Sequence, residues 1–312
     1  MIKVVIFGLG HLGKWHADKV MALADAELVA IVDPNPNTTK ILKEKNIDVP
    51  VFESLSTCQV SFDAGIVVTP TSLHFNLCKE LLNLGKHIFC EKPMTSTFEE
   101  SLELEKLVNE KKVTFQVGHS ERFHSVWAEI LKRDEYFVGQ PIFHLERQAS
   151  FKGRATDVDV VQDLMIHDLD ILLYLINERP FQVTAYGKKM RTDKWDYAEA
   201  HFEYSSGIMA TIKVGRNYVR EVRSFEIIND AGSLVVDLFE KKLIEAPGTA
   251  INDFVIESLY EPRDHLLEEH IAFYKAIKGD GVVPVSVGDG RSAVYLVGKV
   301  ISAIESGQTE KC

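Results

Sequence analysis

The stretch MIKVVIFGLGHLGKWH, residues 1–16, decides how the chain begins to fold. Residues 2–7 form an apolar run rich in β-branched side chains, which is typical of a buried strand. Three glycines follow at once, and behind them a helical pattern continues to about Ala24. A strand, a turn with GxGxxG spacing and a helix in this order predict a loop that binds the diphosphate of a dinucleotide.

The three glycines have different tasks in such a loop. Gly8 allows the tight turn, Gly10 lets the backbone approach the diphosphate, and Gly13 lets the helix pack closely against the strand. The N–H groups at the start of the helix, together with its dipole, then bind the anion. An ordinary glycine turn is the alternative. The predicted cofactor contacts of the loop are the residues of the motif itself: Gly8, Gly10, His11, Leu12 and Gly13.

The acid at the end of the next predicted strand selects the cofactor. Asp33 lies 20 residues beyond Gly13, where a carboxylate accepts hydrogen bonds from the adenosine ribose. A carboxylate repels a 2′-phosphate, and the residues that follow it, PNP at 34–36, include no arginine. We therefore expect NAD rather than NADP. Lys40 is the nearest cation, and its charge leaves NADP binding as the alternative.

Short β-like runs alternate with helical patterns over the first 120 residues. The expected strands are residues 2–7, 27–32, 64–68, 87–90 and 113–117, and later helices are expected at 38–46, 72–84 and 97–110. The strands are apolar on both faces, which favours a parallel sheet covered by helices. We therefore expect an α/β domain at 1–120 with a doubly wound parallel sheet, a Rossmann domain.

The remainder, residues 121–312, has a different pattern. Helices at 125–133 and about 160–176 are expected, with strands at 141–150, 181–190, 197–204, 208–214, 224–229 and 233–238. The turns at 205–207 and 230–232 suit hairpins. Two more helices are expected near 265–277 and 290–305. This pattern predicts an α+β domain with an open antiparallel sheet, whose last helix is a candidate to pack on the first domain.

The composition of the 312 residues limits the classes of function. Hydrophobic residues make up 46% and charged residues 26%, as in soluble globular proteins. The net charge of −11 opposes bulk binding to nucleic acid or to a membrane surface, although a local cluster of cations would still bind a small anion. The four cysteines show no CxxC spacing, so neither a metal site nor a disulfide framework is expected. The apolar runs are too short for a signal sequence or a membrane span, and we expect a cytoplasmic protein.

Two loops behind predicted strands carry polar side chains. Ligands of open α/β sheets bind at the carboxyl ends of the strands, and EKP at 91–93 and TPTSLH at 69–74 follow such ends. We therefore expect Lys92 at the carboxyl edge of the sheet, where it can contact a ligand. The alternative is that Lys92 is an ordinary solvated lysine in a loop. The candidate cofactor contacts on the two loops are Thr69, Pro70, His74, Glu91 and Lys92.

The long predicted helix near 160–176 carries a polar stripe beside its apolar face. Asp163, His167, Asp170 and Tyr174 stand four, three and four residues apart, which places them on one helical face. An imidazole between two carboxylates suggests an oriented general base. The alternatives are a solvated face, a histidine satisfied by neighbouring carboxylates, and metal ligation by Asp163 and His167, for which no third ligand is apparent.

Six motifs together carry a resemblance to a known family over nearly the whole chain. They are GLGHLGKWH at 8–16, VDP at 32–34, TPTSLH at 69–74, EKP at 91–93, GHSERF at 118–123 and DLMIHDLD at 163–170. In this order they resemble the Gfo/Idh/MocA family of nicotinamide-dependent sugar oxidoreductases. The resemblance implies a Rossmann domain followed by an α+β domain, whose open sheet often mediates homo-oligomer contacts. It also implies that Lys92, Asp163 and His167 are catalytic, with Lys92 and His167 holding the reacting hydroxyl and usually the histidine taking its proton.

Two stretches, GHSERF and DVDVVQDLMIHDLDI at 157–171, are similar to the branch of enzymes like UDP-N-acetylglucosamine 3-dehydrogenase. This similarity implies oxidation of a sugar 3-hydroxyl to a ketone. The chain departs from that branch at 124–125, where His-Ser replaces the usual Asn-Pro, and at Asp159, which replaces Gly. Both departures lie near the expected sugar pocket and leave the exact substrate open.

We therefore expect an NAD-dependent dehydrogenase that oxidises a secondary hydroxyl of a sugar, with a nucleotide sugar as the leading substrate. The expected substrate contacts are Lys92, Arg122, Asp163 and His167. A diphosphate needs local cations, and the candidate anchors are Arg122, Arg147, Arg154, Arg216, Arg220 and Arg223. One alternative is a dehydrogenase of a free sugar, an inositol or a dihydrodiol. The other is a non-catalytic sensor that binds NAD(H). A sensor would not explain why Lys92, Asp163 and His167 occur together.

Overall fold

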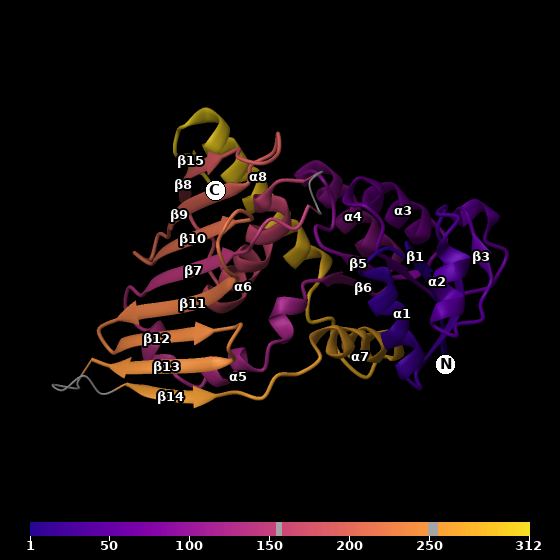
Figure 1. Cartoon of the computed structure of the whole chain (residues 1–312), viewed down its shortest axis with the longest axis horizontal. Coiled ribbons are helices and arrows are strands. Elements are labelled where there is room, and N and C mark those ends of the chain that lie inside the picture. Colours follow the sequence, from indigo (N-terminus) through magenta and orange to yellow (C-terminus); the bar gives the residue numbers. More distant parts are fainter. Residues whose placement is uncertain (154–157, 249–254) are drawn as a thin grey trace. The chain divides into compact units, whose positions relative to one another are not determined.

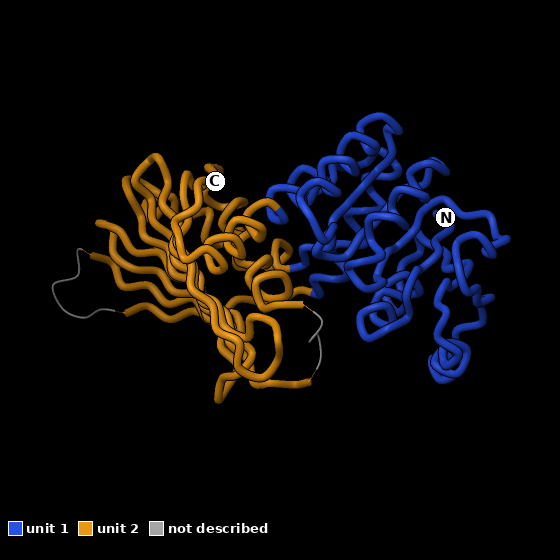
Figure 2. The backbone as a smooth tube through the Cα atoms, turned by 90° about the horizontal axis from the view of Figure 1, so that it is seen from above, with its two compact units in different colours: residues 1–120, 264–294 blue, residues 121–263, 295–312 orange. Residues whose placement is uncertain are grey.

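The computed structural model describes residues 1–153, 158–248 and 255–312. These residues divide into two compact units, one made of residues 1–120 and 264–294 and the other of residues 121–263 and 295–312 (Figure 2). Each unit contains its own sheet and its own functional motifs. Among the described residues, no helix is long and apolar enough to cross a membrane.

The first unit has a six-stranded sheet in the order β3-β2-β1-β4-β5-β6, and all its neighbouring strands are parallel (Figure 1). The strands are β1 (Ile2–Phe7), β2 (Ala26–Val32), β3 (Val51–Phe52), β4 (Ala64–Val67), β5 (His87–Glu91) and β6 (Phe115–Gly118). The order reverses between β1 and β4, and the ligand crevice of a doubly wound sheet lies at such a switch point. The predicted Rossmann fold is confirmed.

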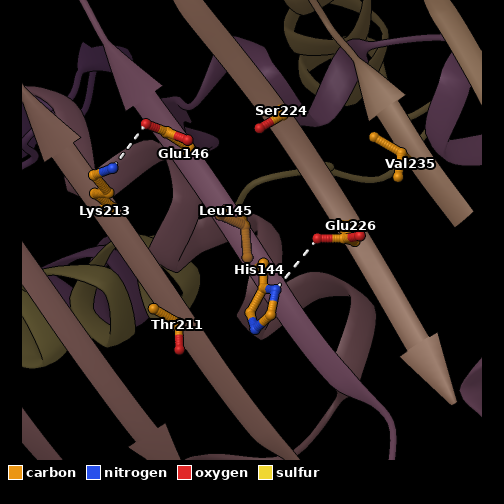
Figure 3. A pocket seen from close by; sticks show the side chains of 8 residues that line it. All are labelled: His144, Leu145, Glu146, Thr211, Lys213, Ser224, Glu226 and Val235. Carbon is orange, nitrogen blue, oxygen red and sulfur yellow. Dashed lines mark hydrogen bonds and ion pairs between the residues drawn. The ribbon is translucent and has the colours of Figure 1, made fainter. Parts of the chain in front are cut away.

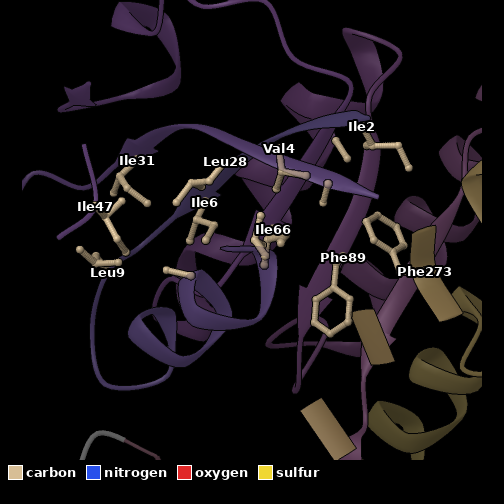
Figure 4. Packing of buried hydrophobic residues seen from close by; sticks show 14 of the residues in the cluster. Ile2, Val4, Ile6, Leu9, Leu28, Ile31, Ile47, Ile66, Phe89 and Phe273 are labelled. Carbon is tan, nitrogen blue, oxygen red and sulfur yellow. The ribbon is translucent and has the colours of Figure 1, made fainter. Parts of the chain in front are cut away.

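Helices cover this sheet through apolar side chains. They are α1 (Gly13–Ala22), α2 (Thr38–Glu44), α3 (Thr71–Asn83), α4 (Phe98–Lys111) and α7 (His265–Lys278). In one core cluster Val4 and Ile6 of β1 pack with Ala17 of α1 and Phe273 of α7 (Figure 4). Thr97 caps α4 by accepting a hydrogen bond from the Glu100 N–H.

The second unit has a nine-stranded sheet in the order β14-β13-β12-β11-β7-β10-β9-β8-β15 (Figure 1). The strands are β7 (Ile142–Gln148), β8 (Gln182–Lys188), β9 (Tyr197–Glu203), β10 (Met209–Gly215), β11 (Val222–Asn229), β12 (Gly232–Asp237), β13 (Lys242–Pro247), β14 (Ile256–Leu259) and β15 (Glu310–Lys311). Its helices are α5 (Val126–Ile130), a π-helical segment (Val161–Met165), α6 (Ile166–Ile176) and the end of α8 (Val287–Ser306).

The two faces of the nine-stranded sheet differ, because side chains alternate along each strand. One face is apolar and buried, with Phe143, Ile212 and Phe225 at or below 1% exposure. The other carries charged pairs across neighbouring strands, His144 with Glu226 and Lys213 with Glu146 (Figure 3). The sequence predicts an open antiparallel sheet here, and the structure shows a mostly antiparallel sheet with one buried face.

The structure adds strands and one parallel pairing that the sequence pattern did not indicate. β7 and β10 pair in parallel, so the sheet is mixed rather than wholly antiparallel. β14 is exposed at every residue, and β3 and β15 have two residues each, so none of them carries the alternation of buried and exposed side chains that marks a strand. The predicted helix near 160–176 opens as a π-helical turn before α6 begins.

Candidate active site

The glycine loop after β1 has no room for a side chain at two of its three glycines. Gly8 has φ +95°, and a Cβ on it would lie 2.7 Å from the carbonyl oxygen of Val68. A Cβ on Gly13 would lie 2.1 Å from the carbonyl oxygen of Gly8, so only glycine lets α1 start this close to β1. A Cβ on Gly10 would meet no described atom within 4 Å, which leaves open space beside the loop. The predicted roles of the three glycines fit this backbone.

Asp33 joins the glycine loop to the end of β2. Its Oδ2 accepts a hydrogen bond from the Leu9 N–H at 2.5 Å, and its Oδ1 accepts one from the Asn35 N–H at 2.8 Å. Each carboxylate oxygen has a second lone pair, so ribose hydroxyls can still bind it. The carboxylate therefore braces the loop and remains able to hold the ribose of a dinucleotide.

His74 ties together the two loops at the carboxyl ends of β4 and β5. Its Nε2 lies 2.8 Å from the Thr69 carbonyl oxygen and its Nδ1 lies 2.8 Å from that of Pro93, while the ring is 1% exposed. Burial lowers its pKa, although both carbonyls oppose this. The two ring nitrogens thus contact the protein backbone. Beside it the buried Oγ1 of Thr69 has no hydrogen-bond partner in the described part of the chain, and it is available to a bound ligand.

The turn that presents Lys92 is fixed by the preceding glutamate. Oε2 of Glu91 accepts the Lys92 N–H at 3.1 Å, and its Oε1 lies 3.0 Å from Nε2 of His16 in α1. Burial acts to raise the pKa of Glu91, but the His16 contact and the charge of Lys92 outweigh it and lower the pKa. His16 and Glu91 are 75 residues apart, so no local pattern indicated this contact.

Asp163 and His167 lie one helical turn apart, in the π-helical segment and in α6, and both are half-buried. Asp159 begins this helix, because its Oδ1 accepts the N–H groups of Val161 and Gln162, each at 2.9 Å. Burial raises the pKa of Asp159. The departure at this position from the similar enzymes therefore provides the cap of the helix that carries the catalytic candidates.

The other two acids of the DLMIHDLD motif are buried and bind arginines. Asp170 accepts two hydrogen bonds from Arg122, both at 2.7 Å, and the Arg122 guanidinium lies over the Tyr174 ring at 5.3 Å. Asp168 accepts from Nη2 of Arg147 at 2.8 Å. Asp170 thus pairs with Arg122, whose planar guanidinium binds both oxygens of this protein carboxylate.

Glu121 connects this ion-pair cluster to the catalytic helix. It lies 3.3 Å from Arg147, 3.3 Å from His124 and 3.6 Å from Arg223. Burial acts to raise its pKa, but the charge of Arg147, the hydrogen bond from His124 and the nearby His167 imidazole hold the pKa well below its usual range. An anion therefore lies within electrostatic reach of His167, and no local pattern indicates it because Glu121 and His167 are 46 residues apart.

The predicted site residues thus fall into two groups, each described within its own unit. The glycine loop, Asp33, the Thr69 loop and Lys92 belong to the first unit, and Arg122, Asp163 and His167 belong to the second. In the described residues no group of three or more His, Cys, Asp or Glu side chains is arranged to hold a metal ion. Arg154, one of the candidate anchors, lies outside the described residues.

A switch-point crevice with this glycine loop and an acid from β2 is the cofactor site of a dehydrogenase that binds a nicotinamide dinucleotide. Residues 2–119 match the model of an oxidoreductase family with an NAD-binding Rossmann fold, GFO_IDH_MocA, and residues 136–235 match the GFO/IDH/MocA C-terminal domain. The chain belongs to the Gfo/Idh/MocA family, as an NAD-dependent dehydrogenase that acts on CH–OH groups.

Three comparisons show how similar individual relatives are. UDP-N-acetylglucosamine 3-dehydrogenase of Acidithiobacillus ferrooxidans is 34% identical over 223 residues, which are 70% of each chain. A solved structure of the enzyme with this name from the same organism has a TM-score of 0.88 and 30% identity, covering 98% of both chains. The scyllo-inositol 2-dehydrogenase (NAD(+)) of Bacillus subtilis is 27% identical over 85% of this chain and 82% of its own.

Proposed function

We propose that this enzyme uses NAD to oxidise a secondary hydroxyl of a nucleotide sugar, with the 3-hydroxyl of UDP-N-acetylglucosamine as the leading substrate. The observation that carries the proposal is the similarity to UDP-N-acetylglucosamine 3-dehydrogenase, 30% identity over 98% of both chains. The shared fold extends through both units, so the similarity includes the substrate domain as well as the cofactor domain.

In the proposed reaction, Lys92 donates a hydrogen bond to the substrate oxygen and stabilises the negative charge that develops on it. His167 accepts the hydroxyl proton on its imidazole, and Asp163 holds a neighbouring hydroxyl or the imidazole. Bound NAD supplies the hydride acceptor for the carbinol carbon. A positioned base typically contributes about 10²–10⁴-fold to the rate, so loss of His167 should be nearly as damaging as loss of Lys92.

The choice of NAD over NADP is part of this proposal. Asp33 already accepts two backbone N–H groups, which fixes its carboxylate at the ribose end of the site. A 2′-phosphate there would meet a negative charge. We expect Asp33→Ser to weaken NAD binding about tenfold and to narrow the preference for NAD over NADP, measured by cofactor fluorescence quenching. An unchanged preference would contradict the assignment.

A second candidate substrate is an inositol, because the chain is 27% identical to an inositol dehydrogenase over 85% of its length. A panel of nucleotide sugars and inositols, read by NADH absorbance, separates the two. We expect turnover with UDP-N-acetylglucosamine and competitive inhibition by UDP. Turnover with inositols alone, without inhibition by UDP, would overturn the nucleotide-sugar substrate and leave the dehydrogenase class intact.

We further propose that the enzyme is a cytoplasmic homo-oligomer and that its copies meet through the outer face of the nine-stranded sheet. The charged pairs of Figure 3 lie on this face, with Tyr186 and Met209 exposed at 65% and 49%. Side chains of opposite charge on adjacent strands can also pair between copies. Sedimentation velocity should show an oligomer that Met209→Glu weakens, and a monomeric wild type would contradict the proposal.

A further inference from the structure

The basic residues of the second unit differ in whether a ligand can use them. Arg122, Arg147 and Arg216 have side chains exposed by 7%, 6% and 8%, and each holds a buried carboxylate. Arg223 differs, because its side chain is 45% exposed and lies 3.6 Å from Glu121, a loose ion pair. Arg223 is therefore the arginine of this group that a ligand can engage without breaking a buried pair.

A pocket in the second unit brings Arg223 together with Asp163. Its cavity has a volume of about 120 Å³ and opens to solvent. Its charged lining residues are Arg147, Lys152, Arg216 and Arg223 on the basic side and Asp163 and Glu221 on the acidic side. Arg147 and Arg216 already hold buried carboxylates, so the exposed cations of the pocket are those of Lys152 and Arg223.

Two further groups in this pocket suit a nucleotide. Gln148 is 3% exposed, and its side-chain nitrogen has no hydrogen-bond partner within the described residues. A buried amide donor without an acceptor is costly, and an oxygen of a bound ligand would satisfy it. Lys152 is 46% exposed and pairs with Glu221, so its ammonium is also reachable.

We propose that Arg223, Lys152 and the Gln148 amide form the subsite for the diphosphate of the nucleotide sugar, with the sugar at Asp163. This inference rests on the proposed function. The planar guanidinium of Arg223 can bind two phosphate oxygens at once, while Lys152 acts as a point charge. The subsite binds the diphosphate and takes no part in the chemistry. It therefore sets the affinity for the nucleotide sugar and leaves the action of Lys92 and His167 unchanged.

The test compares Arg223→Met and Lys152→Met with Arg179→Met, an exposed arginine outside the pocket. Loss of a charge-assisted hydrogen bond should raise the KM for UDP-N-acetylglucosamine about tenfold or more in Arg223→Met, with a smaller rise in Lys152→Met. The kcat and the KM for NAD should stay within about twofold, and the control should match the wild type. Unchanged KM values in both pocket variants would overturn the subsite.

Binding of UDP alone, measured by calorimetry, distinguishes failure of the subsite from failure of the proposed function. UDP binding that weakens in Arg223→Met supports the subsite. Oxidation of UDP-N-acetylglucosamine together with equal UDP binding by wild type and Arg223→Met overturns the subsite and keeps the function. A wild type that oxidises inositols and binds no UDP overturns both.

A different observation carries a second inference, which holds for any substrate. Four buried side chains of the first unit form a continuous hydrogen-bonded chain that ends at Glu91. Tyr274 Oη lies 3.1 Å from Nδ1 of His270, whose Nε2 lies 3.0 Å from Nδ1 of His16, whose Nε2 lies 3.0 Å from Oε1 of Glu91. Both histidines are 0% exposed, and the His270 ring stacks on Phe89.

The direction of the protons follows once both histidines are taken as neutral. An ionised carboxylate only accepts, so Nε2 of His16 donates to Glu91. Nδ1 of a neutral His16 then accepts from Nε2 of His270, and Nδ1 of His270 accepts from the Tyr274 hydroxyl. With both rings neutral, every donor points toward Glu91 and each ring carries its proton on Nε2. Burial lowers the pKa of His270 well below its usual range.

We infer that His16 and His270 are positioning residues for Lys92, acting through Glu91. The carboxylate accepts the Lys92 N–H on its other oxygen, so the chain of hydrogen bonds fixes the turn from which the catalytic amine projects. A Cβ on Gly118 would lie 2.8 Å from Oε1 of Glu91, which shows how closely the carboxylate is enclosed. Displacement of a reacting group by about 1 Å can cost about a hundredfold in rate.

The matched variants are His16→Gln and His16→Leu. A glutamine side chain can donate to Glu91 and accept from His270, whereas leucine can do neither. We expect kcat to fall between about tenfold and a hundredfold in His16→Leu and to recover most of this loss in His16→Gln, with NAD affinity unchanged in both. Equal kcat values in the two variants would overturn the positioning role.

The pH profile adds a readout that simple loosening of the fold would not move. The groups whose charge or hydrogen bonds act on Glu91 are His16 and Lys92, and Glu91 in turn acts on His74 and Cys90. Without His16 the pKa of Glu91 should rise, so His16→Leu should lose kcat on the acid side at a higher pH than His16→Gln. In the wild type, ¹⁵N NMR should show both histidines neutral with Nε2–H. A charged His16 at pH 7 would contradict the proton order.

Discussion

The two units bury their polar groups in opposite ways. Behind Lys92, the first unit has two buried histidines in a hydrogen-bonded chain that ends at a single carboxylate, Glu91. Behind His167, the second unit has full charges in close pairs, Arg147 with Asp168 and Arg122 with Asp170. The stability of the hydrogen-bonded histidine chain depends on which atom carries each proton. The stability of a buried ion pair depends on the presence of both partners. The difference predicts that the first cluster responds to pH and the second responds to deletion of a partner.

The largest effect is expected from Arg147→Met. It leaves Glu121 and Asp168 buried beside each other without their shared cation, so the free energy of unfolding should fall by about 3–5 kcal/mol. Urea denaturation followed by circular dichroism measures this loss. The double variant Arg147→Met/Asp168→Leu should recover part of it, because one of the uncompensated charges is removed. A single variant within about 1 kcal/mol of the wild type would contradict the ion-pair account.

Acidification should affect the first unit next most strongly. Burial lowers the pKa of both His74 and His270, so the unfolded chain binds more protons than the folded one below about pH 6.5. Their contribution to stability is therefore present at pH 7.5 and lost as the pH falls, by about 1.4 kcal/mol per pH unit for each histidine.

Hydrogen exchange, corrected for the intrinsic effect of pH, can follow the two units separately. Between pH 7.5 and 5.5, peptides from β5 and α7 should lose protection, while peptides from β7 and α6 should lose little. The pKa of Glu121 lies well below its usual range, so that carboxylate gives up its contribution only at a lower pH. His270→Gln should reduce the pH dependence, and equal losses in the two units would contradict the contrast.

The smallest effect is expected from an exposed ion pair of the first unit. Lys79 and Glu103 lie 2.6 Å apart with side chains 42% and 46% exposed. Solvent screens such a pair, so Lys79→Met should change the free energy of unfolding by no more than about 1 kcal/mol. The same urea titration measures it, and a loss near that of Arg147→Met would remove the distinction between buried and exposed pairs.

Sequence patterns predicted what depends on local spacing and missed what depends on long-range contact. The GxGxxG spacing and Asp33 belong to one strand–loop–helix–strand segment, and the structure places them together as predicted. The contact between His16 and His270 joins residues 254 apart and has no local signature. In the DLMIHDLD motif, spacing predicted one polar stripe of Asp163, His167 and Asp170, but only the fold shows that Asp170 pairs with Arg122.

The central claim is that Lys92 and His167 act on the same carbinol. Stopped-flow measurement of NADH formation with UDP-N-acetylglucosamine, in Lys92→Ala, His167→Ala and the double variant, tests it most directly. Residues that act as one unit are strongly non-additive. We predict that each single variant slows hydride transfer at least about a hundredfold, that the double variant is no slower than the worse single variant, and that NAD affinity is unchanged in His167→Ala. Losses that multiply in the double variant, or turnover that survives in either single variant, would contradict the claim.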